Sequence, residues 1–435
     1  MRAEIKNRIE QIRQGKVPAG YKKTKQGISP AEWTGMSVKD CLCRVEKPVQ
    51  VEPETLYTQI GIRSHGNGIF YKEPVTGCAL KNKSVFWIEP DCFILNIVFA
   101  WEQAVGRTTK AEKGMIGSHR FPMYRPIEDR VDIDYLVYYF LTPRGTNILE
   151  EASPGGAGRN RTLGQERFLK STILLPPIAE QQKIAKILMT QDRVIALREK
   201  LLAEKLRQKQ YLMQVLLTGK KRLPGYKGKW KTIRFGEVFS FGSTNSFSRQ
   251  FMVSDGDGIH NIHYGDILTK YGEILDARIT KLPVLMKEAG EKIKDFISDG
   301  DIVIADTAED LTAGKVIEVQ HAGTQKIAAG MHTMWCTPKR GYFAPGWLGF
   351  YMNSMHFHRQ LIPYMAGIKV MAISKTNIVK THLLVPSIDE QCAIVTILTC
   401  ADREIELLKK GLEQERRKKK ALMQLLLSGI VRVKP

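Results

Sequence analysis

One long segment occurs twice in this chain, and that duplication most limits what the chain can fold into. The copies span residues 174–219 and 384–429, so they are displaced by 210 positions, and they align without a gap. Under this displacement the pairs EQ, DR and MQ and a final glycine coincide. A match of this length at constant spacing indicates an internal repeat.

Each copy predicts a long helix. Its apolar residues recur every seven positions, as along a coiled-coil seam, and do not alternate as in a strand. Ser387 with Glu390 forms a capping box, and Gly219 and Gly429 supply the left-handed residue that ends a helix. A helix over 178–218 has 41 residues and is about 60 Å long. The two copies are therefore long enough to act as spacers.

An apolar seam needs a partner, and the nearest one is the other copy. The residues expected at this interface are Ile187, Leu188, Ile195, Leu202 and Leu216 in the first copy and Leu398, Ile405, Leu412 and Leu426 in the second. Gln208 with Lys209 and Lys418 with Lys419 interrupt both seams at one place. Pairing within one chain is entropically easier than pairing between molecules, so we expect an antiparallel pair of helices. Homodimeric coiled coils are the alternative.

The composition is that of a globular protein. Hydrophobic residues make up 43% and aromatic residues 8% of the chain, which excludes disordered and fibrous classes. The charged N-terminal residues do not resemble a signal peptide, and the best apolar window, 93–101, is too short for a bilayer. The seven cysteines contain no C-x-x-C pair and no disulfide-like framework. We expect a cytoplasmic protein without a membrane partner.

The charge balance points to a polyanionic partner. The chain has 66 Lys and Arg against 45 Asp and Glu, a formal charge of +21. Basic residues concentrate in 1–30 and 220–231, and each of these segments leads into a globular domain. Charge runs are usually solvated linkers, but two at corresponding points of a repeat favour contact with phosphates.

Each half reads as linker, globular domain and long helix, and Trp33 and Trp230 occupy corresponding positions. Strand-like runs at 91–99 and 301–306, with short helices near 133–141 and 347–354, predict an α+β fold. The expected segments are a first domain with its basic lead-in (1–175), a first helix (176–220), a second domain (221–384) and a second helix (385–431).

The doubled motif resembles a known family. The pattern L-P-P-I-x-E-Q-x-x-I-x-x-I-L, with L-M-Q-x-L-L-x-G downstream, is similar to the helical regions of the specificity subunit of type I restriction-modification enzymes, as are GDIVIADTAEDLTAGK and IHNIHYGDILTKYG. The resemblance covers essentially the whole chain. It implies two α/β target-recognition domains, joined by two antiparallel coiled-coil helices, that each read half of a bipartite site in double-stranded DNA. It also implies two modification (methyltransferase) subunits and further restriction (translocase/nuclease) subunits as partners.

DNA reading requires phosphate contacts for affinity and hydrogen-bonding side chains at base edges for sequence. Suitable side chains gather in three predicted loops and at one further position after a glycine. The candidates are Arg63, His65, Asn67 and Tyr71; Arg159, Asn160 and Arg161; His260, Asn261, His263 and Tyr264; and Lys369. The simpler interpretation of any one of them is an ordinary solvated loop residue.

Catalytic motifs are missing. No Gly-Lys pair is followed by the Ser or Thr of a phosphate-binding loop, and no motif for amino methylation or for a methyl-donor cofactor is present. Asp301 and Glu318 form only a weak nuclease pattern, because Gln320 stands where lysine is usual. His260 and His263 lack further metal ligands nearby. We therefore expect no catalytic residue, metal or cofactor.

Three alternatives stay open. The chain could be a nuclease or methyltransferase with its own recognition domains, or a scaffold in which the coiled coil is the function. It could also be the specificity subunit of a combined, type II-like restriction and methylation enzyme. The target bases, the spacer and the methylated positions do not follow from side-chain identity alone.

Overall fold

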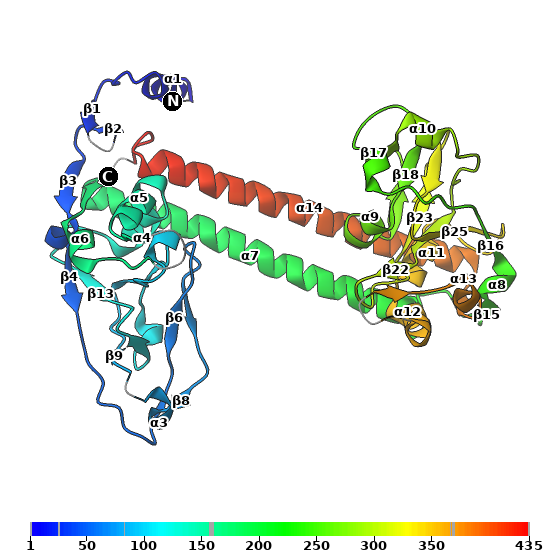
Figure 1. Cartoon of the computed structure of the whole chain (residues 1–435), viewed down its shortest axis with the longest axis horizontal. Coiled ribbons are helices and arrows are strands. Elements are labelled where there is room, and N and C mark those ends of the chain that lie inside the picture. The colour runs from blue at the N-terminus through cyan, green and yellow to red at the C-terminus, as the bar shows by residue number, and fades with distance from the viewer. Residues whose placement is uncertain are drawn as a thin grey trace. The chain divides into compact units, whose positions relative to one another are not determined.

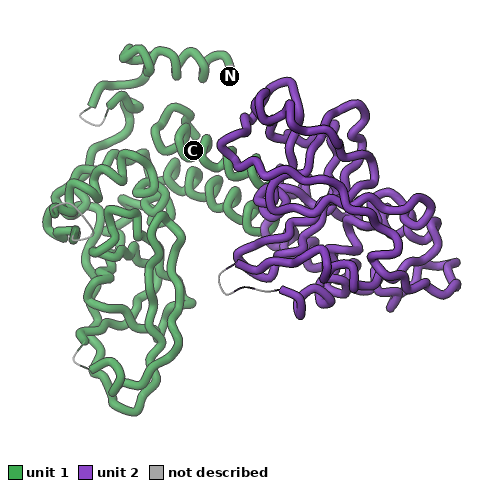
Figure 2. The backbone as a smooth tube through the Cα atoms, turned by 45° about the vertical axis from the view of Figure 1, so that its right-hand side comes forward, with its two compact units in different colours: residues 1–198, 411–435 green, residues 199–410 purple. Residues whose placement is uncertain are grey.

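The protein forms two compact units in a computed structural model that describes residues 2–24, 27–81, 83–155, 161–365, 367 and 370–433. Unit 1 comprises Met1–Arg198 with Gly411–Pro435, and unit 2 comprises Glu199–Lys410 (Figure 2). This division differs from the four expected segments, since the boundary falls inside both long helices. Each unit contains one domain and part of each helix.

Unit 1 combines short strands with helices. Its helices are α1 (Arg2–Arg13), α2 (Val38–Cys41), α3 (Gly77–Leu80), α4 (Ile133–Phe140), α5 (Pro143–Glu151), α6 (Gln165–Lys170), the first part of α7 (Ile178–Leu216) and the last part of α14 (Ile388–Leu427). Its strands are β1 (Tyr21–Thr24), β2 (Gly27–Pro30), β3 (Thr34–Ser37), β4 (Leu42–Val45), β5 (Leu56–Tyr57), β6 (Ile60–Ile62), β7 (Ile69–Tyr71), β8 (Val75–Thr76), β9 (Val85–Trp87), β10 (Phe93–Leu95), β11 (Val105–Arg107), β12 (Ile116–Ser118), β13 (Met123–Pro126) and β14 (Thr172–Leu175). The largest sheet is antiparallel with the order β11-β10-β13-β4, and β14 pairs with β3.

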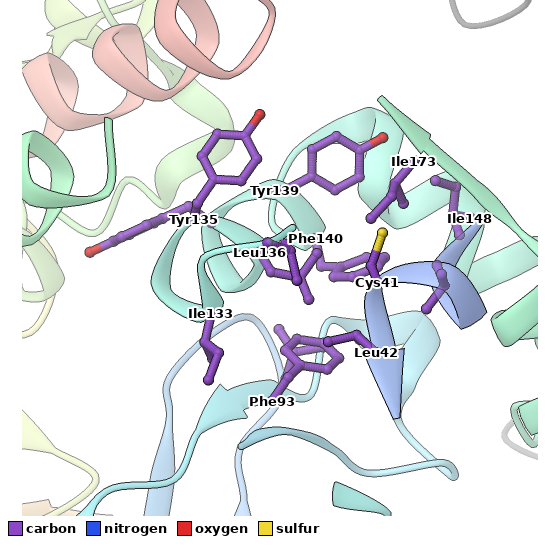
Figure 3. Packing of buried hydrophobic residues seen from close by; sticks show 14 of the residues in the cluster. Cys41, Leu42, Phe93, Ile133, Tyr135, Leu136, Tyr139, Phe140, Ile148 and Ile173 are labelled. Carbon is purple, nitrogen blue, oxygen red and sulfur yellow. The ribbon is translucent and has the colours of Figure 1, made fainter. Parts of the chain in front are cut away.

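The core of unit 1 is aromatic. Phe93 from β10, Phe140 from α4 and Phe168 from α6 are buried against one another, with ring centroids 5.4 to 6.4 Å apart. Figure 3 shows Phe93 and Phe140 within this cluster. Leu188 of α7 and Leu426 of α14 belong to the same cluster. Because both long helices bury apolar side chains in this core, they are integral parts of the unit.

Unit 2 is built on a larger mixed sheet. Its helices are α8 (Phe235–Val238), α9 (Tyr264–Thr269), α10 (Lys287–Gly290), α11 (Trp347–Met352), α12 (Met355–Leu361), α13 (Lys375–Ile378) and parts of α7 and α14 (Ile388–Leu427). Its strands are β15 (Lys231–Arg234), β16 (Phe239–Phe241), β17 (Met252–Val253), β18 (His260–Ile262), β19 (Ile274–Asp276), β20 (Val284–Leu285), β21 (Ile302–Ala305), β22 (Thr307–Ala308), β23 (Val316–Gln320), β24 (Ile327–Ala329), β25 (Thr333–Pro338), β26 (Met371–Ala372) and β27 (His382–Val385). Two sheets have the orders β16-β25-β21-β23-β19 and β17-β20-β18-β24, and β15 pairs with β27.

The long helices α7 and α14 have 39 and 40 residues (Figure 1). In unit 1, Asp192 pairs with Lys419 and Arg198 with Glu415; in unit 2, Lys205 pairs with Glu404 and Lys209 with Asp402. In both units the residue number on α14 falls as the residue number of its partner on α7 rises, so the helices run antiparallel. The pairing is therefore within the chain, as expected.

Most of the expected seam faces inward. Leu188, Leu216, Leu398, Ile405, Leu412 and Leu426 are buried, and Ile195 and Leu202 are half-buried. Ile187 departs from the expectation, because its side chain is 37% exposed. It lies beside the buried Leu188, and neighbouring residues on a helix face different directions. Both helices are followed by a glycine with positive φ, Gly219 at 68° and Gly429 at 75°.

Several local expectations correspond to observed elements. The run at 91–99 contains β10, that at 301–306 contains β21, and the two short helices are α4 and α11. The mixture confirms the α+β class. Within the described part of the chain, no helix is long and apolar enough to cross a membrane.

Candidate nucleic-acid interface

A buried glutamate at the start of α7 joins three segments of unit 1. The Glu180 carboxylate accepts a hydrogen bond from Nε1 of Trp33 at 3.4 Å and two from the guanidinium of Arg432 at 2.8 Å each. Arg432 also donates to Glu32 at 2.7 Å. Charge-assisted bidentate pairs of this kind fix geometry as well as adding energy. Glu180 therefore holds the residues after α14 against those before β3.

Glu390 makes the corresponding contacts at the start of α14 in unit 2. Its carboxylate accepts from Nε and Nη2 of Arg222 at 2.5 and 2.7 Å and from Nε1 of Trp230 at 3.1 Å. The expected capping box is therefore only half formed. The backbone N–H of Glu390 does donate to Oγ of Ser387 at 3.4 Å, but the Glu390 carboxylate is occupied by Arg222 and Trp230.

The glutamine that follows each glutamate is also buried and contacts backbone only. Oε1 of Gln181 accepts from the N–H of Asp132, and Nε2 donates to the carbonyl of Pro176, both at 2.9 Å. Oε1 of Gln391 accepts from the N–H of Ala344 at 2.8 Å, and Nε2 donates to the carbonyl of Pro386 at 3.0 Å. We call Glu180 with Gln181 the first clasp and Glu390 with Gln391 the second clasp.

Two of the lysines that interrupt the seams, Lys419 and Lys209, connect the helix pair to the domains. In unit 1, Lys419 lies 2.6 Å from Asp192, which also accepts a 2.6 Å hydrogen bond from the hydroxyl of Tyr138 on α4. In unit 2, Lys209 lies 2.6 Å from Asp402 and 2.7 Å from Glu273. Burial acts to lower the pKa of Lys209, but the two carboxylates outweigh it and raise that pKa. Lys209 is therefore held as a cation.

In unit 1 the predicted reading loop joins β6 and β7. The side chains of Arg63, His65 and Asn67 are exposed, and the loop is ordered by its own contacts. Nδ2 of Asn67 donates to the carbonyl of Ser64 at 2.9 Å, and the Arg63 guanidinium lies 4.7 Å from the centre of the Phe70 ring. Exposed donors on an ordered loop suit hydrogen bonding to base edges and phosphates.

Tyr71 follows this loop and is engaged with a buried carboxylate. Its hydroxyl donates to Oε1 of Glu112 at 2.5 Å, while half of its side chain stays exposed. Burial acts to raise the pKa of Glu112, but hydrogen bonds from Tyr71 and Thr109 outweigh it and lower that pKa. The ring of Tyr71 is therefore accessible from solvent, whereas its hydroxyl group is already hydrogen-bonded to Glu112.

The predicted reading residues of unit 2 divide into two groups. His260 and Tyr264 are half-buried, whereas Asn261 and His263 are buried. Asn261 lies on β18, where its Oδ1 accepts from Nδ2 of Asn245 at 2.7 Å. His263 caps α9, with Nδ1 accepting from the N–H of Gly265 at 3.2 Å. These two residues have structural roles, because strand and helix begin where the sequence predicted a loop.

The cluster at residues 159–161 and the separate position Lys369 lie mostly outside the described residues. Arg159, Asn160 and Lys369 are not among them, so their contacts are not assigned. Arg161 is described, and its guanidinium lies 5.5 Å from the centre of the Trp101 ring, a cation–π contact.

The weak nuclease pattern has a structural explanation. Oδ2 of Asp301 accepts from Nε1 of Trp335 at 2.8 Å, and the Glu318 carboxylate accepts from the N–H groups of Gly346 and Gly349 at the start of α11. Burial raises the pKa of Glu318. Among the described residues, no group of three or more His, Cys, Asp or Glu side chains could hold a metal ion.

Sequence reasoning did not predict the clasps. The repeated Glu-Gln pair and the equivalent positions of Trp33 and Trp230 were visible, and together they could have indicated a shared contact. The arginines could not be assigned in the same way, because Arg432 lies 252 positions from Glu180.

Comparison with known proteins connects this arrangement to one family. Residues 76–205 match the type I restriction modification DNA specificity domain. The chain is 22% identical over 431 residues to the type I restriction enzyme MjaVIII specificity subunit of Methanocaldococcus jannaschii, covering 93% of this chain and 94% of that protein. It is 26% identical over 319 residues to the putative MjaX specificity subunit of the same organism, covering 72% and 71%.

The fold is shared with solved structures of the same kind. The HsdS subunit from Thermoanaerobacter tengcongensis aligns over 96% of this chain and 98% of its own, with a TM-score of 0.50 and 18% identity. A chain from a study of complex assembly and conformational transition in a type I system aligns over 93% and 99%, with a TM-score of 0.57 and 17% identity. The chain is thus similar, over nearly its whole length, to the type I restriction enzyme specificity subunits.

Proposed function

We propose that this chain is the non-catalytic subunit that reads a bipartite DNA target for a type I restriction-modification complex. The observation that carries this proposal is the pair of matching clasps and helices beside two domains with different loops. The clasps and long helices occur twice in similar form, whereas the domain loops differ. Such a chain could recognise two half-sites of different sequence. The excess of basic residues supplies the attraction to duplex DNA.

The proposed readers of unit 1 are the exposed loop side chains Arg63, His65 and Asn67. Those of unit 2 are the half-buried His260 on β18 and Tyr264 on α9. Arginine and asparagine can make bidentate hydrogen bonds to guanine and adenine in the major groove, which gives base discrimination. Asn261 and His263 are not included, because both are buried and hydrogen-bonded within unit 2.

The central test is co-expression with modification subunits, followed by mapping of methylated positions in the host DNA. We expect methylation at one bipartite motif. Exchange of residues 33–174 for the corresponding segment of a related chain should change one half of the motif, and exchange of 230–384 should change the other. If either exchange altered both halves, the domains would not read independently.

We propose that the helix pair sets the spacing between the half-sites. The test removes one heptad from each helix, residues 199–205 and 405–411, so that the seam keeps its register. Seven residues correspond to about 10.5 Å of helix, or about three base pairs of DNA. The gap in the methylated motif should shorten by about that amount. An unchanged gap would contradict the spacing role.

Two exposed leucines support binding of two modification subunits. Leu197 on α7 is 68% exposed and Leu407 on α14 is 70% exposed, and they are equivalent under the repeat. A single exposed leucine is ordinary on a protein surface. The proposal therefore rests on its recurrence at both equivalent positions of the repeat. Leu197→Asp and Leu407→Asp should each remove one modification subunit, and the double variant both, as measured by native mass spectrometry. Restriction subunits would join the assembly thus formed.

Two other functions give different outcomes. A nuclease or methyltransferase would cut or methylate DNA as the purified chain alone. A coiled-coil scaffold would bind DNA without sequence preference and with a shallow salt dependence, whereas a reader keeps its preference while losing affinity steeply with salt.

A further inference from the structure

A groove in unit 1 brings together segments that are distant in the sequence. It has a volume of about 930 Å³ and lies between the start of α5, the last turns of α14 and the loop that carries His65. Arg144 enters from α5, and Arg416, Lys419 and Lys420 enter from α14. Because His65 is also a proposed reading residue, the groove is continuous with the proposed DNA interface. We call it the α5–α14 groove.

The α5–α14 groove carries charge of one sign. Four Arg and Lys side chains line it, and no Asp or Glu is among the described residues that do so. Lys419 is matched by Asp192 at 2.6 Å, and Arg144 uses one N–H to reach the carbonyl of Ile28 at 3.3 Å. A guanidinium has five N–H donors, so Arg144 retains donors for another acceptor.

Unit 2 has a groove of mixed charge beside the start of α12. A cavity of about 620 Å³ is lined by Glu273 and Asp310 as well as by Lys315 and His358. Under the 210-residue displacement, Arg416 corresponds to Leu206 and Lys420 to Gln210. The uniform positive charge is therefore particular to unit 1, although the helices themselves are a repeat.

We propose that the α5–α14 groove binds phosphate groups of duplex DNA, with Arg416, Lys420 and Arg144 as the contacting side chains. The proposal rests on the proposed function. It assigns to unit 1 contacts with the DNA phosphate backbone that unit 2 does not make through an equivalent groove. Arginine and lysine are the side chains that neutralise phosphates, and such contacts position a protein without reading bases. DNA is favoured over an acidic protein surface because a reading loop forms one wall.

The test compares two double variants that remove the same charge from the same stretch of α14, residues 416–420. R416Q/K420Q changes the groove, whereas R417Q/K418Q changes exposed side chains that do not line it. Full-length protein is titrated, between 50 and 300 mM salt, with a 40-base-pair duplex carrying the mapped motif and with one lacking it. Loss of two phosphate contacts should reduce the slope of log K against log salt by about 1.8. The reduction should be equal for both duplexes, and R144Q should add about 0.9.

The control variant should keep the wild-type slope. The groove assignment is overturned if R416Q/K420Q and R417Q/K418Q lower the slope equally, or if neither does so while wild type retains its preference for the motif. It is also overturned if R416Q/K420Q loses its modification subunits on co-purification yet binds both duplexes normally, since an acidic partner would then occupy the groove. Failure of the proposed function looks different, because wild-type protein itself would then show no preference for any duplex.

Discussion

The two clasps are nearly the same, whereas the loops of the two units are not. Glu180 and Glu390 each bind one tryptophan and one arginine. Gln181 and Gln391 are each hydrogen-bonded to three backbone groups. In contrast, the loop at Asn67 in unit 1 is exposed, and the corresponding prediction in unit 2, Asn261, is buried in a sheet. The contacts that hold each long helix to its domain are thus preserved, while the surfaces of the domains differ. This difference is expected if the helices bind the same kind of partner subunit in both halves and the domains bind different DNA sequences.

The largest effect should come from the clasps themselves. Glu390→Ala leaves Arg222 without its carboxylate, and removing one partner of a buried ion pair costs about 3–5 kcal/mol. Glu180→Ala should cost less, about 2–3 kcal/mol, because Arg432 retains Glu32. Amide hydrogen exchange measured separately for each unit gives these free energies of unfolding. Glu413→Ala, on an exposed pair, is the control. Equal losses for the two glutamates would show that Glu32 contributes nothing.

The next largest difference between the units should come from substitution of the glycines that follow the two long helices. An alanine at either position adopts a positive φ, which costs about 1–2 kcal/mol. A Cβ on Gly429 would lie 2.5 Å from Cγ of Pro30, whereas a Cβ on Gly219 would lie 3.5 Å from the Trp230 ring. Gly429→Ala should therefore cost about 1–3 kcal/mol more than Gly219→Ala. Thermal unfolding of both variants measures the difference, and a larger loss for Gly219→Ala would contradict the packing described here.

Substitution of Lys209 and of Lys419 should give a smaller difference in stability between the two units. The Lys209 side chain is 12% exposed and contacts two carboxylates, whereas that of Lys419 is 26% exposed and contacts one. Lys209→Met should destabilise unit 2 by about 2 kcal/mol, because Glu273 and Asp402 then repel each other with less screening. Lys419→Met should destabilise unit 1 by about 1 kcal/mol. Urea unfolding gives both values, and a reversed order would show that exposure does not govern this contact.

The smallest expected effect is a pH dependence confined to unit 2. Burial, then Arg249, lower the pKa of His263 below its ordinary value, with Asp266 acting in the opposite direction and His332 and Lys270 in the same one. Protons then bind the unfolded state more readily, so stability should fall as pH drops from about 6.5 towards the folded pKa.

His263→Asn should flatten this dependence while keeping a residue that can cap α9. Hydrogen exchange in unit 2 at several pH values between 5 and 8, with unit 1 of the same sample as reference, measures it. An unchanged pH dependence in the variant would assign the effect to another group.

Patterns that repeat could be predicted from the sequence, and contacts between distant residues could not. The period of seven predicted α7 and α14, and Gly219 and Gly429 predicted their ends, because both features are local. The capping box was overestimated, since Arg222 competes for the same carboxylate from 168 positions away. Ile187 shows a related difficulty: where two apolar residues are adjacent, the sequence does not tell which one faces the partner helix.

The candidate site was predicted less well for a physical reason. Polar residues between glycines indicate a loop, and in unit 1 the segment around His65 is one. In unit 2 the similar segment forms β18 and the cap of α9, because Asn261 and His263 find hydrogen-bond partners inside the domain. Composition alone does not separate these cases.

The interleaving of the two units has a consequence for synthesis of the chain. The core of unit 1 requires Leu426 and Leu427, which are separated from the rest of that unit by all of Glu199–Lys410. At about 5–20 residues per second, the ribosome needs roughly 10–40 s to cross this insertion. During that interval the first domain lacks part of its apolar interior, so a nascent chain halted there would be the form most in need of a chaperone.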